Sequence, residues 1–213
     1  LISKAYAAER RALIDPARAL SWDRVPSYGS LKGDTVYIAA VDAAGRILAL
    51  DDVFYHDQGA YPRTHGARVA DRTAGMLPGP YHVPAYRVAA HYRLTNKTPA
   101  ATYRSPGRFE GSFVRERLLD AIAQRIGIDR IEARRRNLIP KSAMPYRREL
   151  DAIGDEVVLD SGDYGGLLDQ ALAGAGWYAL QAALKHRRAA GEAVGAGVAI
   201  FLEERNHVTG SSR

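Results

Sequence analysis

The residues best suited to chemistry lie together in one loop, residues 96–107. Arg104 and the neighbouring Arg108 bring forked, permanently charged donors to this loop, and Gly107 permits close approach of another backbone. Because the loop is expected to join a strand to the start of a long helix, the helix N-terminus adds positive potential. We therefore predict a site for an anion such as a phosphate, a pyrophosphate or an oxyanion. A purely structural strand-to-helix turn is the alternative.

The segments before this loop predict mainly strands. Val, Ile, Leu, Phe and Tyr dominate residues 35–41 and 46–57, and a turn sequence separates them, so we expect a β-hairpin. Residues 86–95 alternate apolar and polar side chains, which predicts a half-buried strand leading into the loop. Two further segments, 3–14 and 68–76, are expected to be helical.

Helices dominate the segments after the loop. Apolar residues at helical spacing predict a long helix that ends at Gly127, and Asp129 with Glu132 resembles the capping box of a second helix. Two more helices are expected around Leu168 and Leu184, and residues 194–203 are expected to form a closing strand. Strands followed by helices, without regular alternation, predict an α+β fold with a mixed sheet and helices packed on it.

The chain is expected to be organised in four regions. These are a helical lead-in (1–32), a main segment (33–140) with the active-site loop at 96–108, a region of linker, helical pair and closing strand (141–205), and a tail (206–213). With 213 residues, 46% of them hydrophobic, the chain can bury a core. Because it starts at Leu1, we expect a segment of a longer protein or a processed chain.

Composition excludes several kinds of chemistry. The chain has no cysteine, so it can form no disulfide, thiolate zinc site, iron–sulfur cluster or cysteine nucleophile of its own. No run of about 18 apolar residues is present and the N-terminus does not resemble a signal peptide, so we expect a cytoplasmic protein without a membrane span. The net charge of +6 would suit nucleic acid. We expect no such partner, because acidic residues interleave with the arginines on predicted helices.

Metal ligands are not expected directly from this chain. His56, Asp57 and His65 fit neither one helical face nor a zinc spacing. The adjacent Asp51 and Asp52 resemble a magnesium site only superficially, and we expect them at an edge or a bulge of their strand.

Residues 102–139, TYRSPGRFEGSFVRERLLDAIAQRIGIDRIEARRRNLI, resemble the molybdopterin-binding large subunit of the xanthine dehydrogenase, aldehyde oxidase and carbon monoxide dehydrogenase family. The segments DQGAYP, GPYHVPAYRV, TNKTP and GVAIFLEE match that family in order. The resemblance covers residues 33–204, the middle of a much longer subunit. The family's glycine-rich and later cofactor segments and its C-terminal glutamate base have no counterpart here, so this chain alone is expected to be catalytically incomplete.

The resemblance implies roles for particular residues. Arg104 matches the arginine beside the molybdenum centre, and the implied cofactor-binding residues are Tyr103, Arg104, Ser105, Pro106 and Gly107. Ser105 stands where carbon monoxide dehydrogenases carry a copper-binding cysteine, which argues against a copper–molybdenum site. Pro106 replaces the substrate-stacking phenylalanine of purine-oxidising relatives. Arg72 matches an arginine that those relatives use to stabilise charge on the heterocycle, so it is a candidate substrate contact.

The function implied by the resemblance is that of a molybdenum hydroxylase acting on an aldehyde or heteroaromatic carbon. Molybdopterin is the implied cofactor, with iron–sulfur clusters and FAD on partner domains or subunits. The implied partners are the remaining part of the molybdenum subunit, the iron–sulfur and flavin subunits, and a small-molecule substrate. Two alternatives are a non-catalytic scaffold or assembly fragment of such a complex and a basic protein that binds acidic ligands or RNA.

Overall fold

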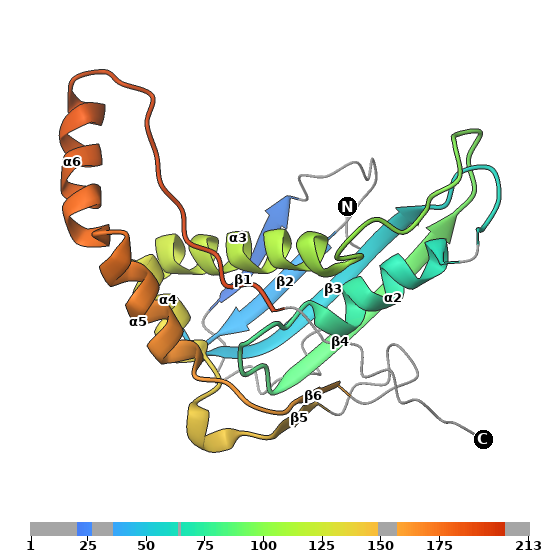
Figure 1. Cartoon of the computed structure of the whole chain (residues 1–213), viewed down its shortest axis with the longest axis horizontal. Coiled ribbons are helices and arrows are strands. Elements are labelled where there is room, and N and C mark those ends of the chain that lie inside the picture. The colour runs from blue at the N-terminus through green and yellow to red at the C-terminus, as the bar shows by residue number, and fades with distance from the viewer. Residues whose placement is uncertain (1–20, 27–35, 64, 149–156, 203–213) are drawn as a thin grey trace.

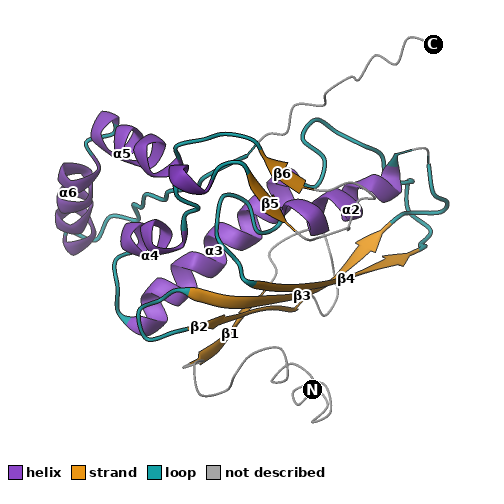
Figure 2. Cartoon of the chain, turned by 90° about the horizontal axis from the view of Figure 1, so that it is seen from below, coloured by secondary structure: helices purple, strands orange, loops and turns teal. Residues whose placement is uncertain are grey.

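The computed structural model describes residues 21–26, 36–63, 65–148 and 157–202. A four-stranded sheet in the order β1-β2-β3-β4 organises the described residues, and their helices lie on one side of it (Figures 1 and 2). The strands β1, β2 and β3 are antiparallel neighbours, whereas β4 runs parallel to β3. The bounds of these strands are β1 Ser21–Pro26, β2 Val36–Val41, β3 Ile47–Asp57 and β4 Ala85–Arg93. The predicted hairpin and the predicted strand before the loop are both confirmed.

Helices α2 and α3 cover the sheet. Helix α4 follows the C-terminal end of α3, and α5 and α6 lie beyond that end, away from α2 (Figure 2). The helices are α2 Gly66–Met76, α3 Arg108–Ile126, α4 Arg130–Asn137, α5 Tyr164–Gly174 and α6 Trp177–Ala189. Smaller elements lie in the expected linker: the 3-10 helix η1 Lys141–Ala143 and the antiparallel strands β5 Tyr146–Arg148 and β6 Val157–Leu159. No helix in the described part of the chain is both long and apolar enough to cross a membrane.

The helix ends follow the residues that predicted them. Gly127 ends α3 in the left-handed conformation, and its N–H bonds back to Ala123. The Asp129 carboxylate accepts hydrogen bonds from the first amides of α4. The Asp129 half of the predicted capping box is present, and the Glu132 carboxylate pairs with Arg136 at 2.7 Å.

Asp51 and Asp52 lie inside β3, which has a neighbouring strand on each side. The expectation of an edge or bulge at these residues is therefore wrong, and the irregularity of the β2–β3 ladder falls at Ala40 and Val41. Asp51 is tolerated there because Arg87, its cross-strand partner on β4, binds the carboxylate at 2.8 Å.

The expected closing strand is absent from residues 194–202, the part of that segment that the structure describes. This extended segment crosses α3 (Figure 1), and arginine side chains from α3 and α4 bind its carbonyls in place of a neighbouring strand. Within the expected lead-in, 1–32, the described residues 21–26 form β1, a strand that the sequence did not predict. The expected helix at 3–14 and the expected tail at 206–213 lie outside the described residues.

Candidate functional site

The loop after β4 is anchored first to the end of β3. The N–H of Thr95 donates to the Gly59 carbonyl at 2.9 Å, and the Lys97 ammonium lies 2.6 Å from an Asp57 carboxylate oxygen. Hydrogen bonds from Lys97, then Thr95 and Gly59, lower the pKa of Asp57 to about 2. The Asp57 carboxylate therefore serves as an anchor for the loop.

The loop then runs along α2. The Thr102 hydroxyl donates to the His65 carbonyl at 3.0 Å. At the end of the loop Gly107 has φ of 75°, and a Cβ there would lie 2.5 Å from the Thr73 nitrogen and the Val69 oxygen. Only glycine permits this approach. Helix α2 is thus the floor of the loop, an arrangement that the sequence did not predict.

Residues 103–107, which we call the site turn, lead directly into α3. Tyr103 is 82% exposed and Arg104 is also exposed, whereas Ser105 and Pro106 are partly buried. Ser105 adopts a left-handed conformation with φ of 62°, which is uncommon for a residue with a side chain. The backbone of the turn is therefore fixed by packing, while the Arg104 guanidinium is open to a ligand or to another part of the protein.

Arg72 lies beside the site turn. It belongs to α2, it is partly buried, and its carbonyl carbon would lie 2.9 Å from a Cβ on Gly107. Local sequence patterns could not have placed these residues together, because the packing of the loop on α2 links them. The roles of Arg72 in substrate contact and of residues 103–107 in cofactor binding stay predictions.

Two residues at the start of α3 change the electrostatic expectation. Arg108, expected to add an open charge to the loop, is only 7% exposed and points into the protein. Burial raises the pKa of Glu110, and the backbone N–H groups of Glu110 and Gly107 act in the opposite direction. The Glu110 and Gly107 N–H groups therefore interact with the Glu110 carboxyl group, and the Arg108 N–H donates to the Ser105 carbonyl, in place of an external anion. An acidic residue in the first helical turn is the signal that could have revealed this.

The candidate metal ligands are used in other ways. His56 Nδ1 lies 2.9 Å from the Gln58 amide nitrogen, and burial lowers the pKa of His56 while Asp57 opposes that change. In the part of the chain that the structure describes, no three His, Cys, Asp or Glu side chains gather as a metal site.

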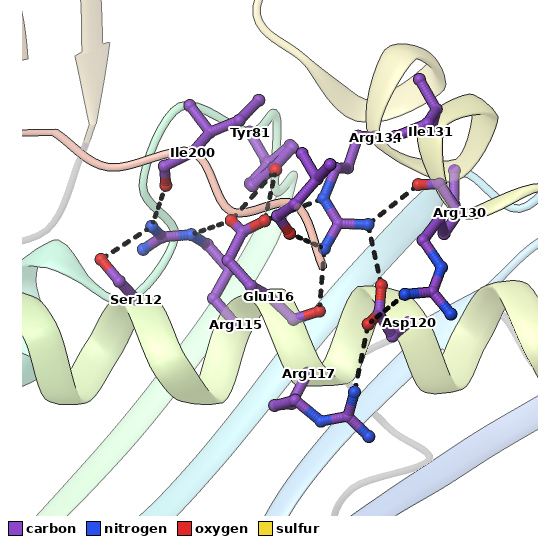
Figure 3. Close-up of polar contacts among 12 residues, drawn as sticks. Tyr81, Ser112, Arg115, Glu116, Arg117, Asp120, Arg130, Ile131, Arg134 and Ile200 are labelled. Atoms are coloured by element: carbon purple, nitrogen blue, oxygen red, sulfur yellow. Dashed lines mark hydrogen bonds and ion pairs between the residues drawn. The ribbon is translucent and has the colours of Figure 1, made fainter. Parts of the chain in front are cut away.

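Residues 79–81, which we call the GPY segment, have a structural role. Tyr81 is fully buried, and its hydroxyl donates to the Glu116 carboxylate at 3.0 Å. Glu116 also binds Arg115 at 3.1 Å and Arg134 at 2.9 Å (Figure 3). Burial, followed by the charge of Glu116, raises the pKa of Tyr81. Tyr81, Arg115, Glu116 and Arg134 form what we call the charge cluster, which joins the GPY segment to α3 and α4.

Comparison with known proteins identifies the family. Residues 32–138 match the molybdopterin cofactor-binding domain, so the chain belongs to this family, as the sequence predicted. The gamma subunit of the 6-hydroxypseudooxynicotine dehydrogenase complex of Paenarthrobacter nicotinovorans is 41% identical over 78% of this chain and 21% of the relative. The carbon monoxide dehydrogenase large chain of Hydrogenophaga pseudoflava is 32% identical over 75% of this chain and 20% of the relative.

A solved structure agrees with this assignment. Quinoline 2-oxidoreductase from Pseudomonas putida 86 superposes with a TM-score of 0.69 and 30% identity, over 78% of this chain and 21% of that chain. The predicted α+β fold of a molybdenum-cofactor-binding domain is confirmed. The chain spans about one fifth of the length of the relatives it matches.

Replacing Gly107 by alanine is expected to lower the free energy of unfolding by more than about 2 kcal/mol, because the new Cβ would strike the backbone of α2. The matched control is Gly127→Ala, which has nearly the same φ but nothing within 4 Å of the new Cβ. It should cost about 1 kcal/mol. Urea unfolding of the two variants measures the difference, and equal losses would contradict close packing of the site turn on α2.

Proposed function

We propose that this chain forms the cofactor-facing part of the large subunit of a molybdenum hydroxylase, an oxidoreductase that hydroxylates an aldehyde or heteroaromatic carbon. The observation that carries the proposal is the site turn of a molybdopterin-binding domain, rigid in its backbone and open at Arg104. A rigid turn with an accessible guanidinium suits the stabilisation of negative charge, because the donors need no reorganisation when charge develops.

The residues of the site turn fit the cofactor. Arg104 offers N–H donors in a fixed fork, which matches oxyanions and phosphate groups, and the close packing of Gly107 on α2 holds that turn in place. Bound molybdopterin would supply the two-electron oxidation of the substrate carbon. Arg104 would then orient and stabilise anionic groups of the cofactor or substrate, and Arg72 would contact the substrate from α2.

Names of the relatives support the substrate class and the partners. The relatives include a nicotine 6-hydroxylase large subunit, and the structural neighbour acts on quinoline, so a nitrogen heteroaromatic is the favoured substrate. The gamma-subunit relative belongs to a complex. We propose that the remaining part of the molybdenum subunit and the iron–sulfur and FAD-containing components complete the enzyme in the cytoplasm, as the sequence predicted.

Arg104→Met is expected to lower kcat/KM by at least about 100-fold while the purified protein keeps its molybdenum. The reason is that the negative charge that develops in the transition state loses the N–H donors of the guanidinium. Arg117→Met is the control, since that side chain is 57% exposed and pairs only with Asp120 in the described structure. Substrate-dependent dye reduction per bound molybdenum is the measurement. Equal rates in the two variants would remove Arg104 from the site, and a parent protein with bound cofactor but no turnover would favour the scaffold alternative.

A further inference from the structure

The buried side chain of Arg115 lies where helices α2 and α3 meet. It is 4% exposed, and each of its nitrogens is bonded. Nη1 donates to the carbonyls of Met76 at 3.3 Å and Leu77 at 2.9 Å, where α2 ends. The last carbonyls of a helix lack intrahelical donors; the Met76 carbonyl also accepts from the Gly79 N–H at 3.0 Å. Arg115 adds a side-chain cap from α3 at the same helix end.

Arg115 also binds on its other side. Nε donates to Glu116 at 3.1 Å, and Nη2 donates to the Ser112 hydroxyl at 3.1 Å and to the Ile200 carbonyl at 2.8 Å (Figure 3). The guanidinium thus joins the end of α2, the side of α3 and the extended segment 194–202. Lysine could not make these bonds together, because its single nitrogen lacks the planar fork.

The seam between α2 and α3 begins at the site turn. Gly111 and Arg115 are four residues apart, so they lie on one face of α3, and Gly107, four residues before Gly111, is the N-cap residue that precedes this helix. Gly107 approaches Val69 and Thr73 of α2, and a Cβ on Gly111 would be 3.5 Å from the Leu77 Cα. The two glycines therefore let the backbones of α2 and α3 approach closely. The hydrogen bonds of Arg115 hold the same helix–helix contact together at the C-terminal end of α2.

This arrangement connects Arg115 to the site turn through the two helices. Helix α2 carries Arg72 and the floor of the turn, and α3 continues directly from Gly107. The separation of the two helices at the turn depends on the hydrogen bonds that Arg115 makes to the end of α2, about 12 Å further along α3. A shift of about 1 Å in such a position is enough to cost a site about two orders of magnitude in rate.

We propose that Arg115 is a positioning residue for the site turn: by tying the C-terminus of α2 to α3, it fixes the turn that carries Arg104 against the helix that carries Arg72. The inference rests on the proposed function only for its catalytic consequence. The geometric part concerns this chain alone. Local sequence patterns do not reveal it, because the carbonyls that Arg115 binds belong to residues 38 to 85 positions away.

Hydrogen exchange of the purified protein with its natural partners tests the geometric part. In Arg115→Met, peptides covering residues 103–110 and the end of α2 are expected to exchange at least about tenfold faster, whereas a peptide from α5 keeps its parent rate. The control is Arg117→Met, two positions along α3 and on its exposed side, which should leave all these peptides unchanged. Arg115→Lys should give an intermediate rate in the site turn, and it replaces the methionine variant if that variant does not fold.

Two results would overturn the proposal. One is an unchanged site turn in both Arg115 variants, and the other is an equal rise in all peptides, which means a loss of global stability alone. Molybdenum content and activity per bound molybdenum are measured on the same samples, and activity per molybdenum should fall at least about tenfold in Arg115→Met. A parent protein without molybdenum would defeat the proposed function, while the exchange result would still decide the role of Arg115.

Discussion

Replacing Glu116 by glutamine is expected to lower the free energy of unfolding by about 3–5 kcal/mol, because two buried guanidinium groups would lose their shared counter-charge. Glu116 is 5% exposed and accepts hydrogen bonds from Tyr81, Arg115 and Arg134. An amide keeps one acceptor but directs its own N–H donors at the arginines. Urea unfolding at neutral pH, followed by far-ultraviolet circular dichroism, measures the loss of stability.

The matched control for Glu116→Gln is Glu132→Gln on α4. The Glu132 side chain is 43% exposed and pairs with Arg136 one turn away. Such an exposed pair contributes about 0.5 kcal/mol or less. If the two variants lost similar stability, the charge cluster would not be the internal support that its burial indicates.

Replacing Asp52 by asparagine is expected to stabilise the protein at neutral pH by about 1–3 kcal/mol. Asp52 is 1% exposed, and neither carboxylate oxygen has a hydrogen-bond partner in the structure as described. Burial raises the pKa of Asp52 well above its usual range, and the charge of Asp51 raises it further. At neutral pH the native protein must therefore bury a charge or bind a proton, and asparagine avoids this cost.

The sign of the pH dependence follows from the raised pKa. When the folded pKa lies above the unfolded value of about 3.9, the group contributes its stability fully below that value. The contribution is lost as the pH rises through the folded pKa. The parent should therefore gain stability on acidification relative to Asp52→Asn, and the difference between the two should vanish below about pH 4.

Asp51→Asn is the control for Asp52→Asn. Asp51 is the adjacent residue of β3 and is equally buried, but Arg87 binds its carboxylate at 2.8 Å. Neutralising it removes the carboxylate charge that Arg87 binds across the strand pair, so this variant should be less stable than the parent at neutral pH. Opposite effects at two adjacent aspartates are the expected result. A loss of stability in Asp52→Asn would contradict the description of an unpartnered carboxyl group.

Local patterns predicted the secondary structure well. The change of apolar period after residue 107 predicted α3, Gly127 predicted its end, and Asp129 predicted the start of α4. Each of these signals lies within a few residues of the feature that it predicts. Residue types and their position between a strand and a helix picked out the loop at 96–107. The family resemblance, which the domain match confirms, gave the residues of that loop their expected roles. Such patterns encode the conformation of short stretches of the chain and the family to which the chain belongs.

The partners of charged side chains were beyond such patterns. Arg134 lies on α4, yet it donates to the Val198 carbonyl 64 positions away, so residues 194–202 look like a strand in sequence but are bound by side chains. Asp51 looked like an edge residue because Arg87, its partner, lies 36 positions away. The floor of the site turn on α2 and the role of Arg115 arise in the same way, from contacts between elements.

Molybdenum and pterin content of the purified protein tests the central claim most directly. The protein is isolated with its natural partners, and metal analysis is combined with fluorescence of the oxidised pterin released from it. We predict equimolar molybdenum and pterin, and loss of both when the cell is deprived of molybdate. A correctly folded protein from molybdate-replete cells that carries neither component would contradict the account.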